Sequence, residues 1–329
     1  MRSLIVHNNA SGFGSDAVFE FERALLERGD ECVMRVLPAS GGSRAALADA
    51  EDFDLVVASG GDGAVSGLLW ELRGRDVLSC VFPSGTANLL HANLGCAAEP
   101  AAIARACRRG LWARTDLGEL SWEDGTGTHV CGFGVMSGTG YDARLMQAAV
   151  PNKQSMGEAA YFAAALKNIR PEVSHFSIEV DGRRYERDGI ACIVANCAMI
   201  QGEVEIVPDS SMDDGRLDVI VLETEDAVHL LRPMFAGLVD PAGNRLGRPY
   251  LEHFSGERVL VRSSRPQPMQ IDGELATEAS QSTRRGHSPP AAGSWWTGSA
   301  ATSPRTTGRR DGGASGRAAP RRSSPISHQ

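Results

Sequence analysis

Two glycine-rich segments combine residue types that can bind phosphate. Gly60-Gly61-Asp62-Gly63-Ala64 and Pro83-Ser84-Gly85-Thr86-Ala87-Asn88 each stand where an apolar, β-branched run, at 53–59 and 76–82, gives way to a helical pattern. Glycines at such a junction let backbone N–H groups approach an anion closely, and the N-terminus of the following helix adds partial positive charge. Because both runs are typical of buried parallel strands, we expect the two loops to leave the same edge of one sheet.

The first 115 residues alternate strand and helix patterns, which predicts a three-layer α/β domain with a parallel sheet covered by helices. A third glycine-bearing loop, Asn8-Asn9-Ala10-Ser11-Gly12, follows the first strand pattern. The remaining expected elements are strands at 4–8 and 32–37, and helices at 16–28 with Ser15 as N-cap, 43–50, 87–94 and 100–109.

Residues 116–275 are rich in strand patterns and predict a second, β-rich domain. The expected strands are 129–135, 176–180, 190–195, 217–222, 258–261 and 269–271, with helices at 156–169 and 226–235. After Glu274 the periodicity stops, and residues 276–329 consist mostly of Ser, Arg, Gly, Pro, Ala and Thr. We predict that this tail is disordered.

Charge and composition exclude several classes of protein. The formal net charge is −8, although the tail beyond residue 275 holds eight Arg and only two acidic residues. The acidic body predicts no nucleic-acid partner. Lysine occurs only at Lys153 and Lys167, away from the glycine loops, which excludes a lysine-bearing phosphate loop. Seven scattered cysteines favour reduced core thiols. With no signal peptide and no transmembrane segment apparent, we expect a cytoplasmic protein.

Six motifs in order resemble the diacylglycerol kinase catalytic-domain family, which includes bacterial lipid kinases and sphingosine kinases. The three glycine-bearing loops match its Asn-Pro-x-Ser-Gly, Gly-Gly-Asp-Gly-Thr and Pro-x-Gly-Thr-x-Asn motifs. The other three are Gly138-Thr139-Gly140-Tyr141-Asp142-Ala143, Asp213-Asp214-Gly215-Arg216-Leu217-Asp218-Val219 and Asp272-Gly273-Glu274. The resemblance covers residues 3 to about 275.

This resemblance implies an N-terminal α/β nucleotide-binding domain and a C-terminal β-sandwich-like domain, with nucleotide in the cleft between them. It also implies transfer of the γ-phosphoryl group of ATP to a lipid hydroxyl. Asp62 implies a shared cation, or else it caps the next helix, and Thr86 donates to phosphate or caps helix 87–94. The implied nucleotide ligands are Asn8, Asn9, Ala10, Ser11, Gly12, Gly60, Gly61, Asp62, Gly63, Ala64, Ser84, Gly85, Thr86 and Asn88.

The resemblance also implies a magnesium site and a catalytic base. Asp214, with Ser211 and the backbone of Arg216, matches the family's structural Mg²⁺ site, although the Asp-Gly pair is equally a turn signal. The Asp272-Gly273-Glu274 segment matches the base, with Glu274 or Asp272 accepting the proton and Asp62 completing the catalytic set. Asp142 either positions the lipid headgroup hydroxyls or belongs to a turn.

Two departures keep alternatives open. Ala64 replaces the usual Thr and removes a hydroxyl donor, and low-complexity sequence follows Asp-Gly-Glu. We therefore weigh a lipid kinase acting on diacylglycerol, a sphingoid base or a related alcohol against two others. These are a soluble kinase of the NAD kinase type and a nucleotide- or lipid-binding protein that has lost catalysis. The expected partner is a lipid at a membrane surface, reached by peripheral association, and a homodimer is left open.

Overall fold

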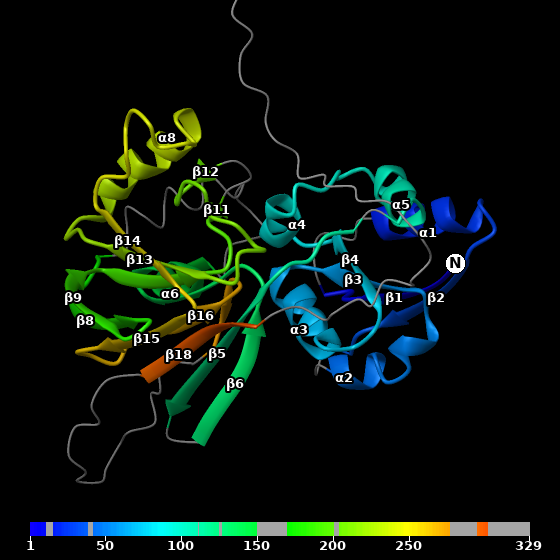
Figure 1. The fold of residues 1–329 in the computed structure, drawn as a ribbon, viewed down its shortest axis with the longest axis horizontal. Coiled ribbons are helices and arrows are strands. Elements are labelled where there is room, and N and C mark those ends of the chain that lie inside the picture. The colour runs from blue at the N-terminus through cyan, green and yellow to red at the C-terminus, as the bar shows by residue number, and fades with distance from the viewer. Residues whose placement is uncertain are drawn as a thin grey trace, which may run out of the picture.

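The computed structural model describes residues 1–10, 16–38, 42–110, 112–124, 127–149, 170–200, 204–276 and 295–301. Figure 1 shows two bodies side by side: an α/β body in blue and cyan, and a sheet-rich body in green, yellow and orange. The predicted helix at 156–169, the N-cap Ser15 and the predicted ligands Ser11 and Gly12 lie outside the described residues. No helix in the described ranges is long and apolar enough to cross a membrane.

The first domain is built on a four-stranded parallel sheet in the order β2-β1-β3-β4. Its strands are β1 (Arg2–His7), β2 (Glu31–Val36), β3 (Leu55–Gly60) and β4 (Leu78–Pro83). All six residues of β3 are buried, as expected for a central parallel strand covered on both faces. The carboxyl ends of β1, β3 and β4 therefore meet at one edge, and the three glycine-bearing loops begin there.

Helices cover both faces of this sheet, which confirms the predicted three layers. On one face, Phe21 of α1 (Ala17–Leu26) and Ile103 of α5 (Pro100–Arg108) pack with Ile5 of β1. On the other, Leu68 of α3 (Asp62–Leu72) packs with Leu4. The predicted helix at 43–50 is shorter, because it divides into α2 (Ser43–Ala46) and the 3-10 turn η1 (Ala50–Asp52). Helix α4 (Leu89–Asn93) follows the second glycine loop.

The second domain is a sandwich of two six-stranded sheets, as predicted. Their orders are β14-β13-β10-β7-β16-β17 and β6-β5-β18-β15-β8-β9. Apolar side chains from both sheets, such as Phe133, Phe176 and Val219, form the core between them. The first sheet holds β7 (Met136–Gly140), β10 (Ala191–Ala195), β13 (Leu217–Leu222), β14 (Leu251–Gly256), β16 (Met269–Ile271) and β17 (Glu274–Leu275). The second holds β5 (Leu117–Asp124), β6 (Gly127–Phe133), β8 (Ser174–Val180), β9 (Arg183–Gly189), β15 (Arg258–Ser263) and β18 (Trp295–Ala301).

Helical segments cover the outer face of the first of these sheets. Tyr141 and Leu145 of α6 (Tyr141–Ala149) and Leu230 of the 3-10 turn η2 (Ala227–Leu230) pack on Ile220 of β13. Helix α8 (Leu231–Val239) follows η2 without a break, close to the predicted 226–235. It contacts the short hairpin formed by β11 (Met199–Ile200) and β12 (Val204–Glu205).

Strand β18 corrects the prediction of disorder for part of the tail. Trp295–Ala301 pairs antiparallel with β5 on one side and β15 on the other, inside the second sheet. The prediction failed because a strand with neighbours on both sides needs no alternating apolar pattern of its own; its backbone hydrogen bonds come from its neighbours. Residues 277–294 and 302–329, which the same prediction covered, lie outside the described residues.

Contacts between the domains join helix α3 to strand β6 and to the residues just after it. A methyl group built on Gly132 of β6 would lie 2.3 Å from the Trp70 ring of α3, so only glycine fits against that ring. One turn earlier on α3, the Ser66 hydroxyl accepts the backbone N–H of Gly134 at 3.0 Å. Helix α3, which begins in the first glycine loop, is therefore held directly against the sandwich.

Candidate functional site

The two glycine loops touch each other through their backbones. A Cβ atom built on Gly85 would lie only 2.4 Å from Gly61 Cα, so the contact requires glycine at position 85. Asn88 closes the second loop: its Oδ1 accepts the Gly85 N–H at 2.7 Å, and its Nδ2 donates to the Gly85 carbonyl at 2.8 Å. Asn88 has a φ of 48°, a left-handed conformation that asparagine tolerates. The structure thus brings the predicted loops together as one surface.

Asp62 links the two loops rather than capping the helix that it begins. Its carboxylate accepts the backbone N–H groups of Leu89 at 3.0 Å and Leu90 at 2.8 Å, in the first turn of α4. Burial raises its pKa, opposed by these hydrogen bonds. Asn88, not Thr86, is the N-cap of α4, which removes the capping alternative for Thr86. Thr86 is exposed.

A chain of polar side chains, of which the sequence indicated only Ser84 as a site residue, supports the loops from the protein interior. His7 Nδ1 lies 2.9 Å from Ser59 Oγ, and Ser59 Oγ lies 2.6 Å from Ser84 Oγ. These three side chains are buried at the ends of β1 and β3 and just after β4, and burial lowers the pKa of His7, which favours the neutral imidazole. A polar residue at the last buried position of successive parallel strands was the available sequence signal.

The third glycine-bearing loop, which follows β1, meets this chain of polar side chains through Asn8. The Asn8 N–H donates to the Ser59 carbonyl at 2.8 Å, and Asn8 Oδ1 accepts the Ala10 N–H at 3.1 Å. Asn9 and Ala10 are exposed. Of the predicted nucleotide ligands, those that the structure describes therefore gather at one edge of the parallel sheet.

Glu274 reaches this surface from the other domain. A Cβ atom built on Gly63 would lie 2.8 Å from both Cδ and Oε1 of Glu274, so the carboxylate rests directly on the Gly63 backbone. Glu274 is exposed, at the start of β17 in the edge hairpin with β16. The tertiary structure thus places a solvent-accessible carboxylate beside the first glycine loop, and the role of Glu274 as a base stays a prediction.

Asp272, the alternative base, is fully engaged with backbone groups. Its Oδ2 accepts the Gly134 N–H at 2.8 Å, and its Oδ1 accepts the N–H groups of Val135 at 2.9 Å and Met136 at 3.0 Å. Burial raises its pKa to about 6, opposed by hydrogen bonds from Ser66 and these amides. Its φ of 48° forms the turn that leads to Glu274. The geometry makes Asp272 a positioning residue for the hairpin.

Gln270, also missed from the sequence, connects this turn to Asp142. Its Oε1 accepts the Gly273 N–H at 2.8 Å, and its Nε2 donates to Asp142 Oδ2 at 3.2 Å. Burial raises the pKa of Asp142 to about 6, and Asp142 Oδ1 has no hydrogen-bond partner among the described residues. A Cβ atom on Gly138 would lie 1.6 Å from Asp142 Oδ2, so a larger residue at position 138 would collide with the Asp142 side chain.

The predicted metal ligands lie on one loop with crowded carboxylates. Ser211 Oγ donates to Asp213 Oδ1 at 2.5 Å, and Asp214 Oδ1 accepts the Arg216 N–H at 2.9 Å. Burial, with the negative charges of Asp214 and Asp213, raises the pKa of Asp116, whose Oδ2 accepts the Gly215 N–H at 2.7 Å. The Arg216 guanidinium binds Ser255 instead of these acids.

This donor set suits a hard divalent cation, because several oxygen atoms carry negative charge without a basic side chain to offset it. Within the described ranges, however, no three or more His, Cys, Asp or Glu side chains converge in a metal-binding geometry. Asn196 connects this loop to the segment that binds Asp272, because its Nδ2 donates to the Asp116 and Gly134 carbonyls, each at 2.9 Å. Mg²⁺ at this loop stays a prediction.

Comparison with known families gives two matches that together span most of the described chain. The diacylglycerol kinase catalytic domain matches residues 2–120. The YegS C-terminal NAD kinase beta sandwich-like domain matches residues 135–291. The first match contains the glycine loops, and the second contains Glu274 and the acidic loop.

Individual relatives are distant. A diacylglycerol kinase of Bacillus subtilis is 25% identical over 290 residues, which cover 83% of this chain and 89% of that protein. An uncharacterized protein of Synechocystis is 26% identical over 266 residues, which cover 76% of this chain but only 56% of that protein. A crystal structure of a diacylglycerol kinase from Bacillus anthracis shares the fold, with a TM-score of 0.66 and 17% identity over 91% of this chain and 94% of that chain.

Proposed function

This chain belongs to the diacylglycerol kinase catalytic-domain family, and we propose that it transfers the γ-phosphoryl group of ATP to the hydroxyl group of a lipid alcohol. The observation that carries the proposal is the contact of the Glu274 carboxylate with the Gly63 backbone. It places an acid–base group at the surface where phosphate would bind.

The glycine loops would hold the triphosphate with backbone N–H groups and the Thr86 hydroxyl. Asp62 occupies the Leu89 and Leu90 N–H groups, so it fixes the position of the second loop relative to the first. Its negative charge is thereby directed into the protein and away from the incoming phosphates. The buried chain from His7 to Ser84 keeps the strand ends in register beneath them. Rigid donors of this kind stabilise transferring phosphoryl groups without reorganisation.

Glu274 would accept the proton of the lipid hydroxyl while the oxygen of that hydroxyl forms a bond to the γ-phosphorus. The bond between the γ-phosphorus and ADP breaks in the same step. Its exposure allows an acceptor to reach it, whereas Asp272 already receives three backbone hydrogen bonds. A general base of this kind contributes about 10²- to 10⁴-fold to the rate. Asp272 and Gln270 would act by holding the turn that carries Glu274.

Mg²⁺ bound by Ser211, Asp214 and the Arg216 backbone, with Asp116 and Asp213 beside them, would neutralise the crowded carboxylates. Such an ion would order the loop that Asn196 connects to Gly134, next to the Asp272 turn. The acceptor in this proposal is diacylglycerol, a sphingoid base or a related alcohol. Asp142 Oδ1 has no partner in the described structure, but it is buried, so we assign Asp142 no contact with the headgroup.

The test is transfer of label from γ-labelled ATP, with magnesium, to diacylglycerol or sphingosine in mixed micelles and, separately, to NAD. We expect label in lipid, and a loss of at least about 100-fold in Glu274→Gln. The matched control is Glu257→Gln, because Glu257 is an exposed glutamate in the turn between β14 and β15. It should retain the unmodified rate.

Three outcomes would overturn the proposal. Label entering NAD but no lipid would indicate a kinase of the NAD kinase type. ATP binding without transfer to any acceptor would indicate a binding protein that has lost catalysis, for which Ala64 is the sequence feature. Equal rates in Glu274→Gln and Glu257→Gln would remove Glu274 from the role of base.

A further inference from the structure

The outer face of η2 and α8 exposes apolar side chains at helical spacing. Val228 is 51% exposed, Leu231 51%, Phe235 62%, Leu238 52% and Val239 52%. The opposite side of the same helix is also apolar, with Pro233, Ala236 and Gly237 buried. A helix whose inner apolar face is already packed has no structural need for an outer one, and contiguous exposed apolar side chains mark interaction sites.

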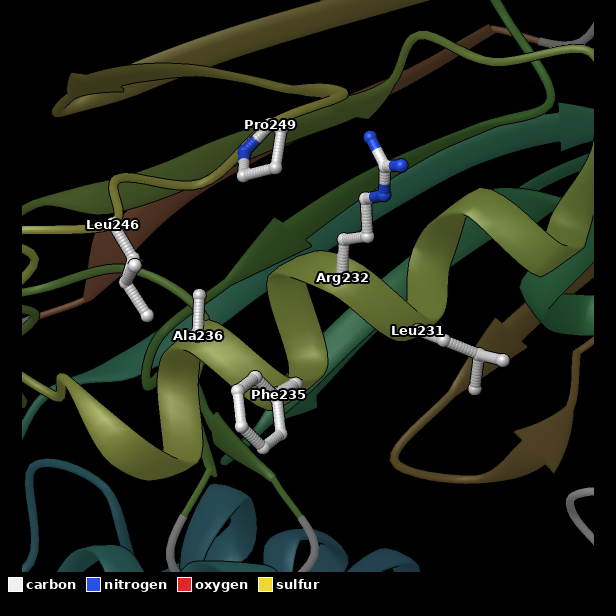
Figure 2. A pocket seen from close by; sticks show the side chains of 6 residues that line it. All are labelled: Leu231, Arg232, Phe235, Ala236, Leu246 and Pro249. Carbon is white, nitrogen blue, oxygen red and sulfur yellow. The ribbon is translucent and has the colours of Figure 1, made fainter.

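The chain after α8 extends this surface. Leu246 is 52% exposed, and with Pro249 it borders a hollow of about 380 Å³ against α8. Figure 2 shows Leu246 and Pro249 across from the helix, with Arg232 reaching up on the other side of Pro249 from Leu246, and with Phe235 and Leu231 projecting from the helix. We call the exposed residues Val228, Leu231, Phe235, Leu238, Val239 and Leu246 the α8 face.

Two arginines border the α8 face, and two of the acidic residues beside it, Asp226 and Asp240, accept backbone N–H groups. Arg232 and Arg245 are exposed, and neither forms an ion pair within the described part of the chain. Asp226 accepts the Val228 N–H at 2.9 Å, and Asp240 accepts the N–H groups of Arg245 at 2.8 Å and Leu246 at 2.9 Å. Arg232 and Arg245 are therefore available to bind anions at the border of the apolar surface, where Glu225 and Asp226 are also exposed.

The inner side of α8 packs on the β11–β12 hairpin of the second domain. Gly237 packs so closely on β12 that a Cβ atom there would lie 2.6 Å from the Glu205 carbonyl oxygen. On the same hairpin, the Met199 backbone exchanges hydrogen bonds with the Asn93 side chain of α4, which follows the second glycine loop. The α8 face is thus joined through one hairpin to the predicted phosphate site.

We propose that the α8 face binds the surface of an anionic lipid bilayer. Its apolar side chains would enter the boundary between headgroups and acyl chains, and Arg232 and Arg245 would bind lipid phosphates through charge-assisted hydrogen bonds. An apolar helical face with two arginines that form no ion pair within the described residues fits the boundary between the acyl chains and the phosphates of that surface. Membrane binding stands on these observations alone; delivery of the acceptor lipid to the site rests on the proposed function.

The test is co-sedimentation of the full chain with vesicles of phosphatidylglycerol and phosphatidylcholine. We expect Phe235→Ser to weaken partitioning about tenfold, because a buried aromatic side chain contributes at least that much. Its matched control is Phe19→Ser, since Phe19 is 46% exposed on α1 of the other domain and should change partitioning less than twofold. Arg232→Gln should weaken binding about fivefold at low salt, and Arg28→Gln, on an exposed arginine of the first domain, should not.

Further measurements separate this inference from the proposed function. Phe235→Ser should phosphorylate a short-chain diacylglycerol dispersed as monomers at the unmodified rate, yet lose activity on vesicles. If no lipid is phosphorylated but vesicle binding follows the α8 face, the proposed function fails and the inference stands. Equal loss in Phe235→Ser and Phe19→Ser, or no vesicle binding by the unmodified protein, would overturn the inference. A dimer in sedimentation equilibrium that Phe235→Ser dissociates would assign the face to a second copy and also overturn it.

Discussion

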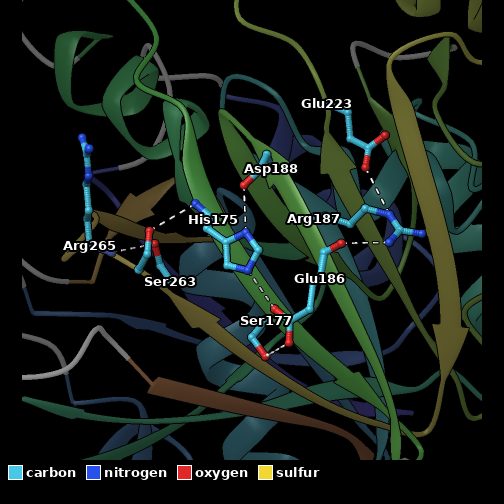
Figure 3. A network of polar contacts seen from close by, with 9 residues as sticks. His175, Ser177, Glu186, Arg187, Asp188, Glu223, Ser263 and Arg265 are labelled. Carbon is cyan, nitrogen blue, oxygen red and sulfur yellow. Dashed lines mark hydrogen bonds and ion pairs between the residues drawn. The ribbon is translucent and has the colours of Figure 1, made fainter.

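Two hairpins of the sandwich carry acidic side chains in contrasting surroundings. In the β16–β17 hairpin, Asp272 is only 8% exposed and accepts three backbone N–H groups. In the β8–β9 hairpin, the His175 ring lies between Asp188 at 2.8 Å and Glu186 at 2.9 Å, as Figure 3 shows. The side chains of His175, Glu186 and Asp188 are 50%, 46% and 71% exposed.

The contrast teaches that the number of charged contacts does not measure their importance. Water screens the His175 cluster, and exposed ion pairs contribute about 0 to 1 kcal/mol. The Asp272 carboxylate replaces water for three buried amides, each of which costs about 1 to 3 kcal/mol when left without a partner. The first hairpin can therefore hold Glu274 in one place, whereas the second stabilises only its own surface.

Removing the Asp272 carboxylate should have the largest effect. We expect Asp272→Ala to lower the free energy of unfolding by at least about 3 kcal/mol, because the Gly134, Val135 and Met136 N–H groups lose their acceptor. Urea unfolding measures this value. Asp188→Ala in the other hairpin is the control, with an expected loss under about 1 kcal/mol. Equal losses in the two variants would refute the comparison.

The pH dependence of stability gives the next largest effect. The pKa of Asp142 is raised from 3.8 to about 6, so between pH 4 and 6 the folded protein binds more protons at this site than the unfolded chain. Its contribution to stability therefore falls as the pH rises through that window, by up to about 3 kcal/mol. Asp142→Asn lacks this titration.

Urea unfolding of both proteins from pH 4 to pH 7 is the measurement. The difference in unfolding free energy should shift in favour of Asp142→Asn up to pH 6 and then remain constant. Asp272 titrates in both proteins and cancels from the difference. A difference that does not change with pH would show that Asp142 is not buried as the structure has it.

Two glycines of α3 separate the position of Glu274 from the stability of the helix. Gly63→Ala should displace the Glu274 carboxylate, which lies 2.8 Å from the new Cβ, and lower the lipid kinase rate about tenfold. Gly67→Ala is the matched control, because its Cβ would meet only Ser43 Oγ at 3.9 Å. It should stabilise the protein by about 0.5 to 1 kcal/mol without lowering the rate. Equal rates in the two variants would show that the Glu274 contact has no part in the reaction.

The surface hairpin should give the smallest effect. Hydrogen bonding to Asp188 raises the pKa of His175 above 6.5; burial opposes this shift, and hydrogen bonding to Glu186 adds to it. Its stabilising contribution is therefore fully present below pH 6.5 and is lost as the pH rises through the raised pKa. Unfolding of the unmodified protein and His175→Gln should differ by about 0.5 kcal/mol at pH 6 and by less at pH 9. A difference above about 2 kcal/mol would contradict the role of solvent screening.

Much of the fold followed from local patterns. Strands β13 and β16 span the residues predicted for them, and β13 carries the β-branched, largely apolar run that is typical of a buried strand. Strand β7 was missed, since Met136-Ser137-Gly138-Thr139-Gly140 consists largely of small residues. Gly138 is there to admit Asp142, a tertiary requirement that leaves no local pattern.

The candidate site was predictable in composition but not in geometry. The sequence indicated Asp62, Asp272 and Glu274 together as catalytic acids, yet only Glu274 is exposed beside a glycine loop. Asp62 and Asp272 are bound to backbone amides of distant segments. Their partners at Leu89, Leu90 and Gly134 carry no side-chain signal, because the contacts use the N–H group that nearly every residue has.

By itself, the sequence determined the parallel sheet, the glycine loops at its edge and the phosphate chemistry that such loops permit. These features depend on local backbone preferences and on the periodicity of apolar residues, which a single chain displays directly. The tertiary structure alone decided which carboxylate reaches the loops. That choice depends on the packing of Trp70 and Ser66 of α3 against Gly132 and Gly134 of the sandwich, a contact between surfaces that the sequence does not relate.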